Sequence, residues 1–172
     1  MLKKIAIIGA GLSGALLAQR LQNKAIVTVF DKARGPGGRV SSLRTDNHSF
    51  DKGAQEFTVK DKQVLDVIKP ALASGILSHW TPRFMNVQSN KQTLIEVPEN
   101  RYFCGFGNLN QLAQYWLKDI NCHYSCPIIT LEGEKGDWFL VNDALQKFGP
   151  FDEIIMTQPA QQVLALAPEF ES

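Results

Sequence analysis

The stretch KKIAIIGAGLSGALLAQRLQNKAIVTVFD, residues 3–31, decides the fold of this chain. Residues 3–8 are an isoleucine-rich run that ends in glycine, which is typical of a buried strand. Residues 12–22 have apolar positions on one side and polar positions on the other, which predicts a helix. Residues 25–30 are rich in β-branched side chains and predict a second strand. Strands connected in this way run parallel, with a right-handed crossover, and belong to a sheet covered on both faces.

Three glycines stand between the first strand and the helix in a GxGxxG pattern. Gly9 allows a tight turn, Gly11 lets the backbone approach a pyrophosphate, and Gly14 lets the helix pack closely on the strand. The start of the helix adds free N–H groups and roughly half a positive charge. Asp31 ends the second strand, where its carboxylate can accept hydrogen bonds from an adenosine ribose. Together these features favour dinucleotide binding over a glycine-rich turn without a ligand.

A second glycine-rich segment, RGPGGRVSS, occupies residues 34–42. Arg34 and Arg39 flank the glycines, and arginine is suited to planar, bidentate contacts with phosphate. The glycines between them let backbone N–H groups approach an anion. The alternative interpretation is an exposed basic loop, but the position directly after Asp31 favours a second part of the same nucleotide site.

The chain has 172 residues, of which 44% are hydrophobic, and its formal net charge is +1. This composition supports a packed core and argues against a nucleic-acid binder that acts through bulk charge. Residues 1–18 resemble a signal peptide, but their apolar run is interrupted by three glycines and is too short to span a bilayer, and no later stretch is long and apolar enough to do so. We therefore expect no membrane partner, and the cysteine usage favours a cytoplasmic location. Cys104, Cys122 and Cys126 are too few for a disulfide scaffold and indicate reduced thiols. The spacing around Cys122 and His123 matches no common zinc pattern, so we expect no metal site.

The whole pattern predicts an α/β fold with three layers: a parallel sheet, helices on one side and a small antiparallel crossover hairpin on the other. We expect that hairpin at residues 128–141. Residues 1–58 and 101–172 should form the nucleotide-binding domain, and residues 59–100 should be an insertion that holds part of a substrate domain. Because the sheet returns near the end of the chain and would usually continue, we expect the fold to be incomplete at its C-terminus.

Local signals predict further elements. Asp61 can cap a helix that Pro70 should end or kink. Asn108 begins another helix, with Gln111 in the capping-box position. The remaining predicted elements are a strand at 49–59 interrupted at Gly53, a hairpin of residues 84–87 and 93–97, the two strands 128–131 and 138–141, a strand at 152–157, and a helix from Pro159 to Leu166.

The segment FDKARGPGGRVSS (residues 30–42), together with the GxGxxG, resembles the corresponding motifs of the flavin-containing amine oxidase superfamily, and most closely those of its renalase-like branch. The likeness continues in FDKGAQ (residues 50–55), in FGNL (residues 106–109) and in DEIIMTQPAQQ (residues 152–162). Two positions depart from the family: Asn108 stands where a methionine is usual, and Asp31 stands where glutamate is more frequent. The resemblance spans nearly the whole chain, and its N-terminal motifs are the specific ones.

The resemblance implies FAD as cofactor, in an FAD/NAD(P)-binding Rossmann-like fold. It implies that the glycines hold the pyrophosphate, that Asp31 holds the adenosine ribose, and that Arg39 lies at the flavin-side phosphate and ribityl chain. Gln55 is then the nearest candidate to the reacting ring, and no catalytic residue is identified. The full set of expected cofactor-binding residues is Gly9, Ala10, Gly11, Leu12, Ser13, Gly14, Asp31, Lys32, Arg34, Gly38, Arg39, Val40, Ala54, Gln55 and Ile128.

The function implied by the resemblance is that of an FAD-dependent oxidoreductase acting on a small molecule. A dihydronicotinamide or an amine would deliver a hydride to flavin N5, and oxygen would reoxidise the flavin. Family members are roughly twice as long as this chain, which leaves an alternative: a non-catalytic or split flavin- or nucleotide-binding module that needs a homodimer partner or a complementing chain. A simple NAD-dependent dehydrogenase is the third possibility, but the RGPGGR and GAQ segments argue against it.

Overall fold

The computed structural model describes residues 1–88, 91–95 and 102–167. Its centre is a four-stranded, fully parallel sheet with the strand order β10-β2-β1-β14. Both strands and the helix predicted at the N-terminus are confirmed, and the late strand lies directly beside the first one. The strands are β1 (Lys3–Ile8), β2 (Ala25–Phe30), β10 (Asn121–His123) and β14 (Glu153–Met156).

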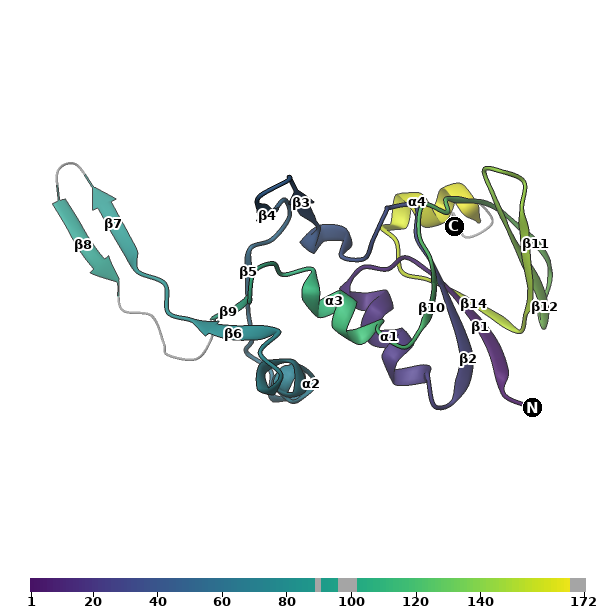
Figure 1. The fold of residues 1–172 in the computed structure, drawn as a ribbon, viewed down its shortest axis with the longest axis horizontal. Helices are drawn as coiled ribbons and strands as arrows, with labels where there is room; N and C mark the ends of the chain where they lie inside the picture. Colours follow the sequence, from purple (N-terminus) through teal and green to yellow (C-terminus); the bar gives the residue numbers. More distant parts are fainter. Residues whose placement is uncertain (89–90, 96–101, 168–172) are drawn as a thin grey trace.

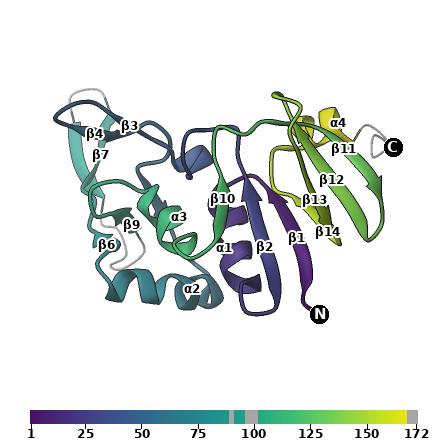
Figure 2. The same cartoon turned by 45° about the vertical axis from the view of Figure 1, so that its right-hand side comes forward.

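Two different layers cover the parallel sheet, as predicted (Figures 1 and 2). On β1, Ile5 and Ile7 belong to the core shared with the helices, whereas Ala6 and Ile8 belong to the core shared with the antiparallel sheet. This alternation follows from the two-residue period of a strand. The helical layer holds α1 (Leu12–Leu21) and α3 (Gln111–Trp116), and the antiparallel layer holds β11 (Ile128–Glu134), β12 (Asp137–Asn142) and β13 (Lys147–Phe151).

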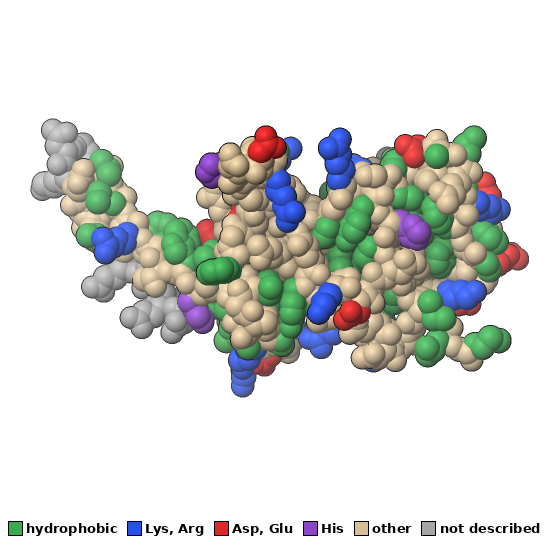
Figure 3. All heavy atoms as spheres, viewed as in Figure 1, with side chains coloured by type: hydrophobic (Ala, Val, Ile, Leu, Met, Phe, Trp, Pro, Cys, Tyr) green, Lys and Arg blue, Asp and Glu red, His purple; other side chains and the backbone are tan. Residues whose placement is uncertain are grey.

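A second group of elements extends away from the parallel sheet (Figure 1). A three-stranded sheet of order β5-β9-β6 packs with α2, and the hairpin β7–β8 projects beyond it. Figure 3 shows exposed hydrophobic side chains along this hairpin. The elements are η1 (Gly38–Val40), β3 (Ser42–Arg44), β4 (Ser49–Asp51), β5 (Glu56–Thr58), α2 (Lys62–Ala73), β6 (Leu77–Trp80), β7 (Phe84–Gln88), β8 (Lys91–Ile95), β9 (Tyr102–Gly105) and α4 (Ala160–Leu166).

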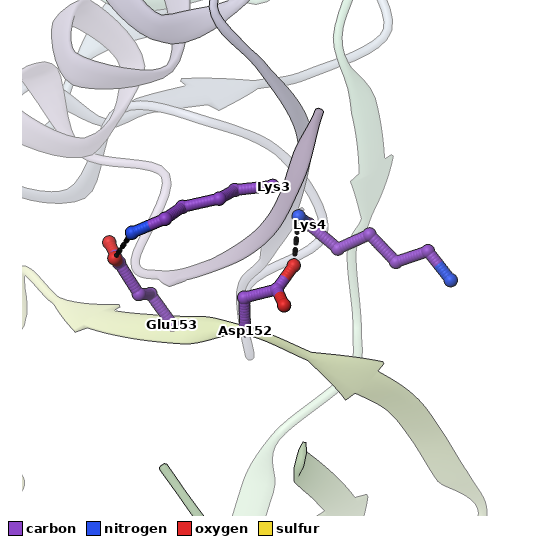
Figure 4. Close-up of polar contacts among 4 residues, drawn as sticks. All are labelled: Lys3, Lys4, Asp152 and Glu153. Carbon is purple, nitrogen blue, oxygen red and sulfur yellow. Dashed lines mark hydrogen bonds and ion pairs between the residues drawn. The ribbon is translucent and has the colours of Figure 1, made fainter. Parts of the chain in front are cut away.

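Polar contacts join β1 to β14 near the amino end of β1 (Figure 4). The ammonium group of Lys3 pairs with the carboxylate of Glu153, and the backbone N–H of Lys4 donates to Asp152 Oδ2 at 2.6 Å. The two strands also share a four-residue parallel register, from Ile5 opposite Glu153 to the end of β1. These contacts place the end of β14 next to the first glycine turn, although 149 positions separate Thr157 from Ile8 in the sequence.

Several sequence predictions about the later elements are wrong in detail. Helix α3 begins at Gln111 and not at Asn108, and no side chain caps it. Asn108 is buried and its side chain donates to Asp51 instead, so the expected capping box does not form. Helix α2 is capped by Asp61 as predicted and ends at Ala73, three residues past Pro70, so Pro70 does not end it directly; a kink at Pro70 stays a prediction. The predicted crossover hairpin is a three-stranded sheet, because β13 adds to β12.

Within the described residues, no helix is long and apolar enough to cross a membrane. The predicted hairpin of residues 84–87 and 93–97 corresponds to β7 and β8, whose second strand begins at Lys91, two residues earlier than predicted. Residues 89–90 of its turn and residues 96–97 of its predicted second strand lie outside the described part of the chain. The division into a nucleotide-binding domain and an insertion at residues 59–100 stays a prediction.

Candidate functional site

A cavity of about 1050 Å³ opens at the carboxyl ends of β1, β2 and β14. In parallel α/β sheets this is the edge at which ligands bind. The cavity volume lies just above the roughly 300–1,000 Å³ that small-molecule sites usually have, which suits a ligand of dinucleotide size. Its walls come from the glycine turn after β1, the end of β2, the second glycine loop, the start of β11, and α4.

The glycine turn after β1 forms the cavity wall beneath the start of α1. Gly9 has a φ of +112°, a conformation that favours glycine. A side chain on Gly14 would overlap the carbonyl oxygen of Gly9, so this position has no room for a larger residue. Leu12 and Ser13, the first residues of α1, line the cavity. The free N–H groups at the start of this ten-residue helix can therefore serve an anionic ligand.

The carboxylate of Asp31 fixes the position of two loops at the cavity. Its Oδ2 accepts from the backbone N–H of Ala10 at 2.6 Å, and its Oδ1 accepts from that of Ala33 at 2.8 Å. Ala10 is fully buried, so Asp31 satisfies an amide that water does not reach. Each carboxylate oxygen has two lone pairs, so Asp31 keeps acceptor capacity toward the cavity that it lines.

The second glycine loop lies directly on the first. The N–H of Gly37 donates to the carbonyl of Ala10 at 2.9 Å, and Gly37 forms an isolated parallel bridge with Gly11. A side chain on Gly38 would lie 3.3 Å from the Cα of Gly11. This close backbone contact brings Arg39 to the cavity wall, because Arg39 follows immediately in η1. The two sequence motifs therefore form one site.

The segment after β4 packs against the second loop. Ala54 donates its N–H to the carbonyl of Arg39 at 2.9 Å, and Gly53 donates to that of Ser41 at 3.0 Å. A side chain on Gly53 would overlap the carbonyl of Arg39. Ala54 lines the cavity, whereas Gln55 is exposed and does not line it. The resemblance-based placement of Gln55 near a reacting ring stays a prediction.

The later part of the chain supplies the opposite wall. Lys32 Nζ donates to Gln162 Oε1 at 3.2 Å, which joins the loop after β2 to α4. The hydroxyl of Thr157 lies 3.1 Å from the carbonyl oxygens of Ile8 and Gly9, and so holds the end of β14 on the glycine turn. The lining residues that the sequence did not predict are Ile8, Phe30, Ala33, Gly37, Cys126, Pro127, Ile129, Thr157, Gln158, Pro159, Gln162, Ala165 and Leu166.

Most of the expected cofactor-binding residues meet at this one cavity. Those that line it are Gly9, Gly11, Leu12, Ser13, Asp31, Lys32, Gly38, Arg39, Val40, Ala54 and Ile128. Ala10, Gly14, Arg34 and Gln55 do not line it. Ala10 and Gly14 are buried behind the wall, where they shape the glycine turn, whereas Arg34 and Gln55 are exposed outside it. The role of each residue in binding a cofactor stays a prediction.

Two titratable groups with shifted pKa values, Cys122 and Tyr124, precede Cys126 on β10 and the loop after it; they pack against the helix-side core and do not line the cavity. Burial raises the pKa of the Cys122 thiol above its ordinary value of 9.0. Burial also raises the pKa of the Tyr124 hydroxyl well above 10.0, and the neighbouring Cys122 and Asp31 add to this effect. Both groups are therefore neutral at physiological pH, and the charges that line the cavity come from the carboxylate of Asp31 and the cations of Lys32 and Arg39.

Comparison with known protein families gives a match over residues 7–70, to the NAD(P)-binding Rossmann-like domain. The phytoene desaturase (neurosporene-forming) of Rhodobacter capsulatus is 45% identical over 60 residues, which is 34% of this chain and 12% of the relative. The 4,4'-diapophytoene desaturase (4,4'-diaponeurosporene-forming) of Staphylococcus aureus strain Newman is 43% identical over 51 residues, 29% of this chain and 10% of the relative. The chain thus matches only a small part of the length of these curated relatives.

A solved structure has the same fold over almost the entire chain. It is that of a candidate protoporphyrinogen oxidase from Exiguobacterium sp. 255-15, with a TM-score of 0.71 at 12% identity. The likeness covers 97% of this chain and 62% of the other, so it extends well beyond the segment shared with the desaturases. Residues 7–70 of this chain match the NAD(P)-binding Rossmann-like domain. The structural likeness shows in addition that the chain as a whole has a Rossmann-like α/β fold built around a parallel sheet.

Proposed function

We propose that this chain is an FAD-binding oxidoreductase of the flavin-type class to which the family resemblance points. The observation that carries the proposal is the single cavity in which the GxGxxG turn, Asp31 and the GGR loop meet. A pyrophosphate needs N–H donors and nearby cations, and the start of α1 with Lys32 and Arg39 offers both. The matching relatives are named as desaturases and the fold neighbour as an oxidase, which supports redox chemistry.

The residues present fit a dinucleotide in shape as well as in charge. A side chain built on Gly11 would meet no protein atom closer than the Gly37 carbonyl at 4.0 Å, so this glycine leaves open space for a ligand next to the backbone. In our proposal Asp31 accepts from the adenosine ribose hydroxyls, and Ile128 and its neighbours on β11 contact the adenine. Arg39, Val40 and Ala54 then hold the flavin-side part of the molecule.

FAD, when bound, would accept a hydride from a substrate and pass the electrons to oxygen. The proposed donor is a dihydronicotinamide or an amine, as the renalase-like resemblance suggests. The task of this chain's own residues is to bind and orient the cofactor, because a flavin enzyme requires no protein nucleophile. The alternative of a binding module without catalysis has less support, because the matching relatives are named as redox enzymes.

Flavin binding and turnover are tested separately. The purified protein is titrated with FAD and, in parallel, with NAD⁺ and ADP by isothermal calorimetry. The proposal predicts saturable binding of FAD that is tighter than that of NAD⁺. The FAD complex is then mixed without oxygen with reduced nicotinamides and with amines, and loss of the flavin absorbance reports reduction. Binding of NAD⁺ but not FAD would contradict the proposal and favour a nicotinamide-dependent dehydrogenase.

A further inference from the structure

The carboxylate of Asp51 joins the β3–β4 hairpin, in which Ser42 is its opposite residue, to a segment more than 50 residues away in the sequence. Its Oδ1 accepts from the hydroxyl of Ser42 at 3.1 Å, from the side-chain amide of Asn108 at 3.3 Å and from the N–H of Leu109 at 3.0 Å. Its Oδ2 accepts from the same Leu109 N–H at 3.2 Å. Asn108 and Leu109 are buried, so their donors depend on this carboxylate rather than on water.

The segments that Asp51 holds lead directly into the wall of the cavity described above. Three residues after Asp51, Ala54 lines the cavity and donates its N–H to Arg39. Ser42 continues the chain from Arg39 and Val40, which also line the cavity. Asp51 therefore sits between two cavity-lining segments and ties both to the turn before α3. Asp51 does not line the cavity itself.

We infer that Asp51 is a positioning residue for the part of the cavity lined by Arg39, Val40 and Ala54. Through Leu109 it fixes β4 to the turn before α3, and through Ser42 it fixes β4 to the segment that carries Arg39. The inference rests on the proposed function in one respect: this part of the cavity takes the half of FAD that ADP lacks. ADP occupies only the Asp31 and glycine-turn part, so Asp51 should affect binding of FAD and not of ADP.

The test compares FAD and ADP binding by calorimetry in three variants. Asp51→Ala removes all four contacts, and we expect FAD affinity to fall about tenfold or more, while ADP affinity stays within about twofold. Asp51→Asn keeps Oδ1 as an acceptor for Ser42, Asn108 and Leu109, and should restore most of the FAD affinity. Asp46→Ala, an exposed position in the turn between β3 and β4, is the matched control and should change neither affinity.

A second readout needs no ligand. In Asp51→Ala the N–H of Ala54 should exchange with solvent faster than in wild type, because its acceptor Arg39 is no longer held in place; the amides of β1 should be unchanged. Equal loss of FAD and ADP binding, an Asp51→Asn variant as weak as Asp51→Ala, or unchanged exchange at Ala54 would each overturn the inference. If wild type binds ADP but not FAD, the proposed function fails, and the exchange at Ala54 still decides the role of Asp51.

Discussion

The carbonyl oxygen of Gly9 occupies the space in which a side chain on Gly14 would have to lie. This contact packs the first turn of α1 onto the end of β1, and it sets the direction in which the helix start faces the cavity. Gly11, between the two, makes no such contact and borders open space. Two glycines of the motif therefore have separable tasks: Gly14 serves folding, and Gly11 serves ligand access.

Gly14→Ala should destabilise the fold. The overlap with Gly9 forces a backbone shift that costs about 1–3 kcal/mol, more than the roughly 1 kcal/mol that alanine gains in a helix. Urea unfolding followed by circular dichroism measures the difference. Gly35→Ala is the matched control, because a side chain there meets no atom within 4 Å, and its stability should equal or slightly exceed that of wild type. A Gly14→Ala variant as stable as wild type would refute the packing role.

Gly11→Ala should leave folding intact and impair binding. Gly11 has a φ of −71°, which alanine adopts freely, so the free energy of unfolding should change by less than about 0.5 kcal/mol. The added methyl group enters the space that we assign to the pyrophosphate, so ADP and FAD affinities should both fall about tenfold or more. Calorimetry on the folded variant measures this. Undiminished affinity for both ligands would place the ligand elsewhere in the cavity.

Asp31→Ala should weaken both stability and nucleotide binding. The variant leaves the buried N–H of Ala10 without its acceptor, which costs about 1–3 kcal/mol of unfolding free energy. It also removes the proposed acceptor for the ribose hydroxyls. Asp137→Ala, at an exposed position on β12, serves as the control and should behave like wild type. An Asp31→Ala protein that binds ADP as wild type does would contradict the ribose assignment, whatever its stability.

Stability should fall at alkaline pH because of Cys122 and Tyr124. Their pKa values are raised in the folded protein, so in the unfolded chain these groups lose their protons first, from about pH 9 upward. The unfolded state then binds fewer protons than the folded state, and the free energy of unfolding decreases as the pH rises through this range. Cys122→Ser removes the cysteine part of the effect. Urea titrations at about pH 8 and about pH 10.5 should show a smaller decrease in the variant than in wild type. An identical decrease would assign the effect to other groups.

The sequence predicts the first half of the site well because its signals are local. Strand, glycine turn, helix, second strand and Asp31 follow one another within 31 residues, and each is specified by its own neighbours. The opposite wall of the cavity, which the later part of the chain supplies, could not be predicted in this way. Thr157 and Gln162 reach the cavity only because β14 pairs with β1, and a pairing between distant strands leaves no local pattern. The sequence predicts Lys32 at the site but not its hydrogen-bond partner Gln162.

Two wrong predictions have specific physical causes. Asn108 resembles a helix cap in sequence, but the carboxylate of Asp51 competes for its side chain, and the helix begins three residues later. The sequence does not predict strand β13, because its segment KFGPF contains a glycine and a proline, which usually indicate a turn. In both cases tertiary contacts override a sound local signal.

The most direct test of the central claim is the absorbance spectrum of the purified protein after incubation with FAD and passage through a desalting column. Our account predicts that the protein fraction keeps flavin bands near ~450 nm, because the cofactor is held by the glycine turn, Asp31 and the GGR loop together. Arg39→Ala should lose part of this flavin in the same experiment. A colourless wild-type protein, folded by circular dichroism and saturated with FAD before the column, would contradict the account.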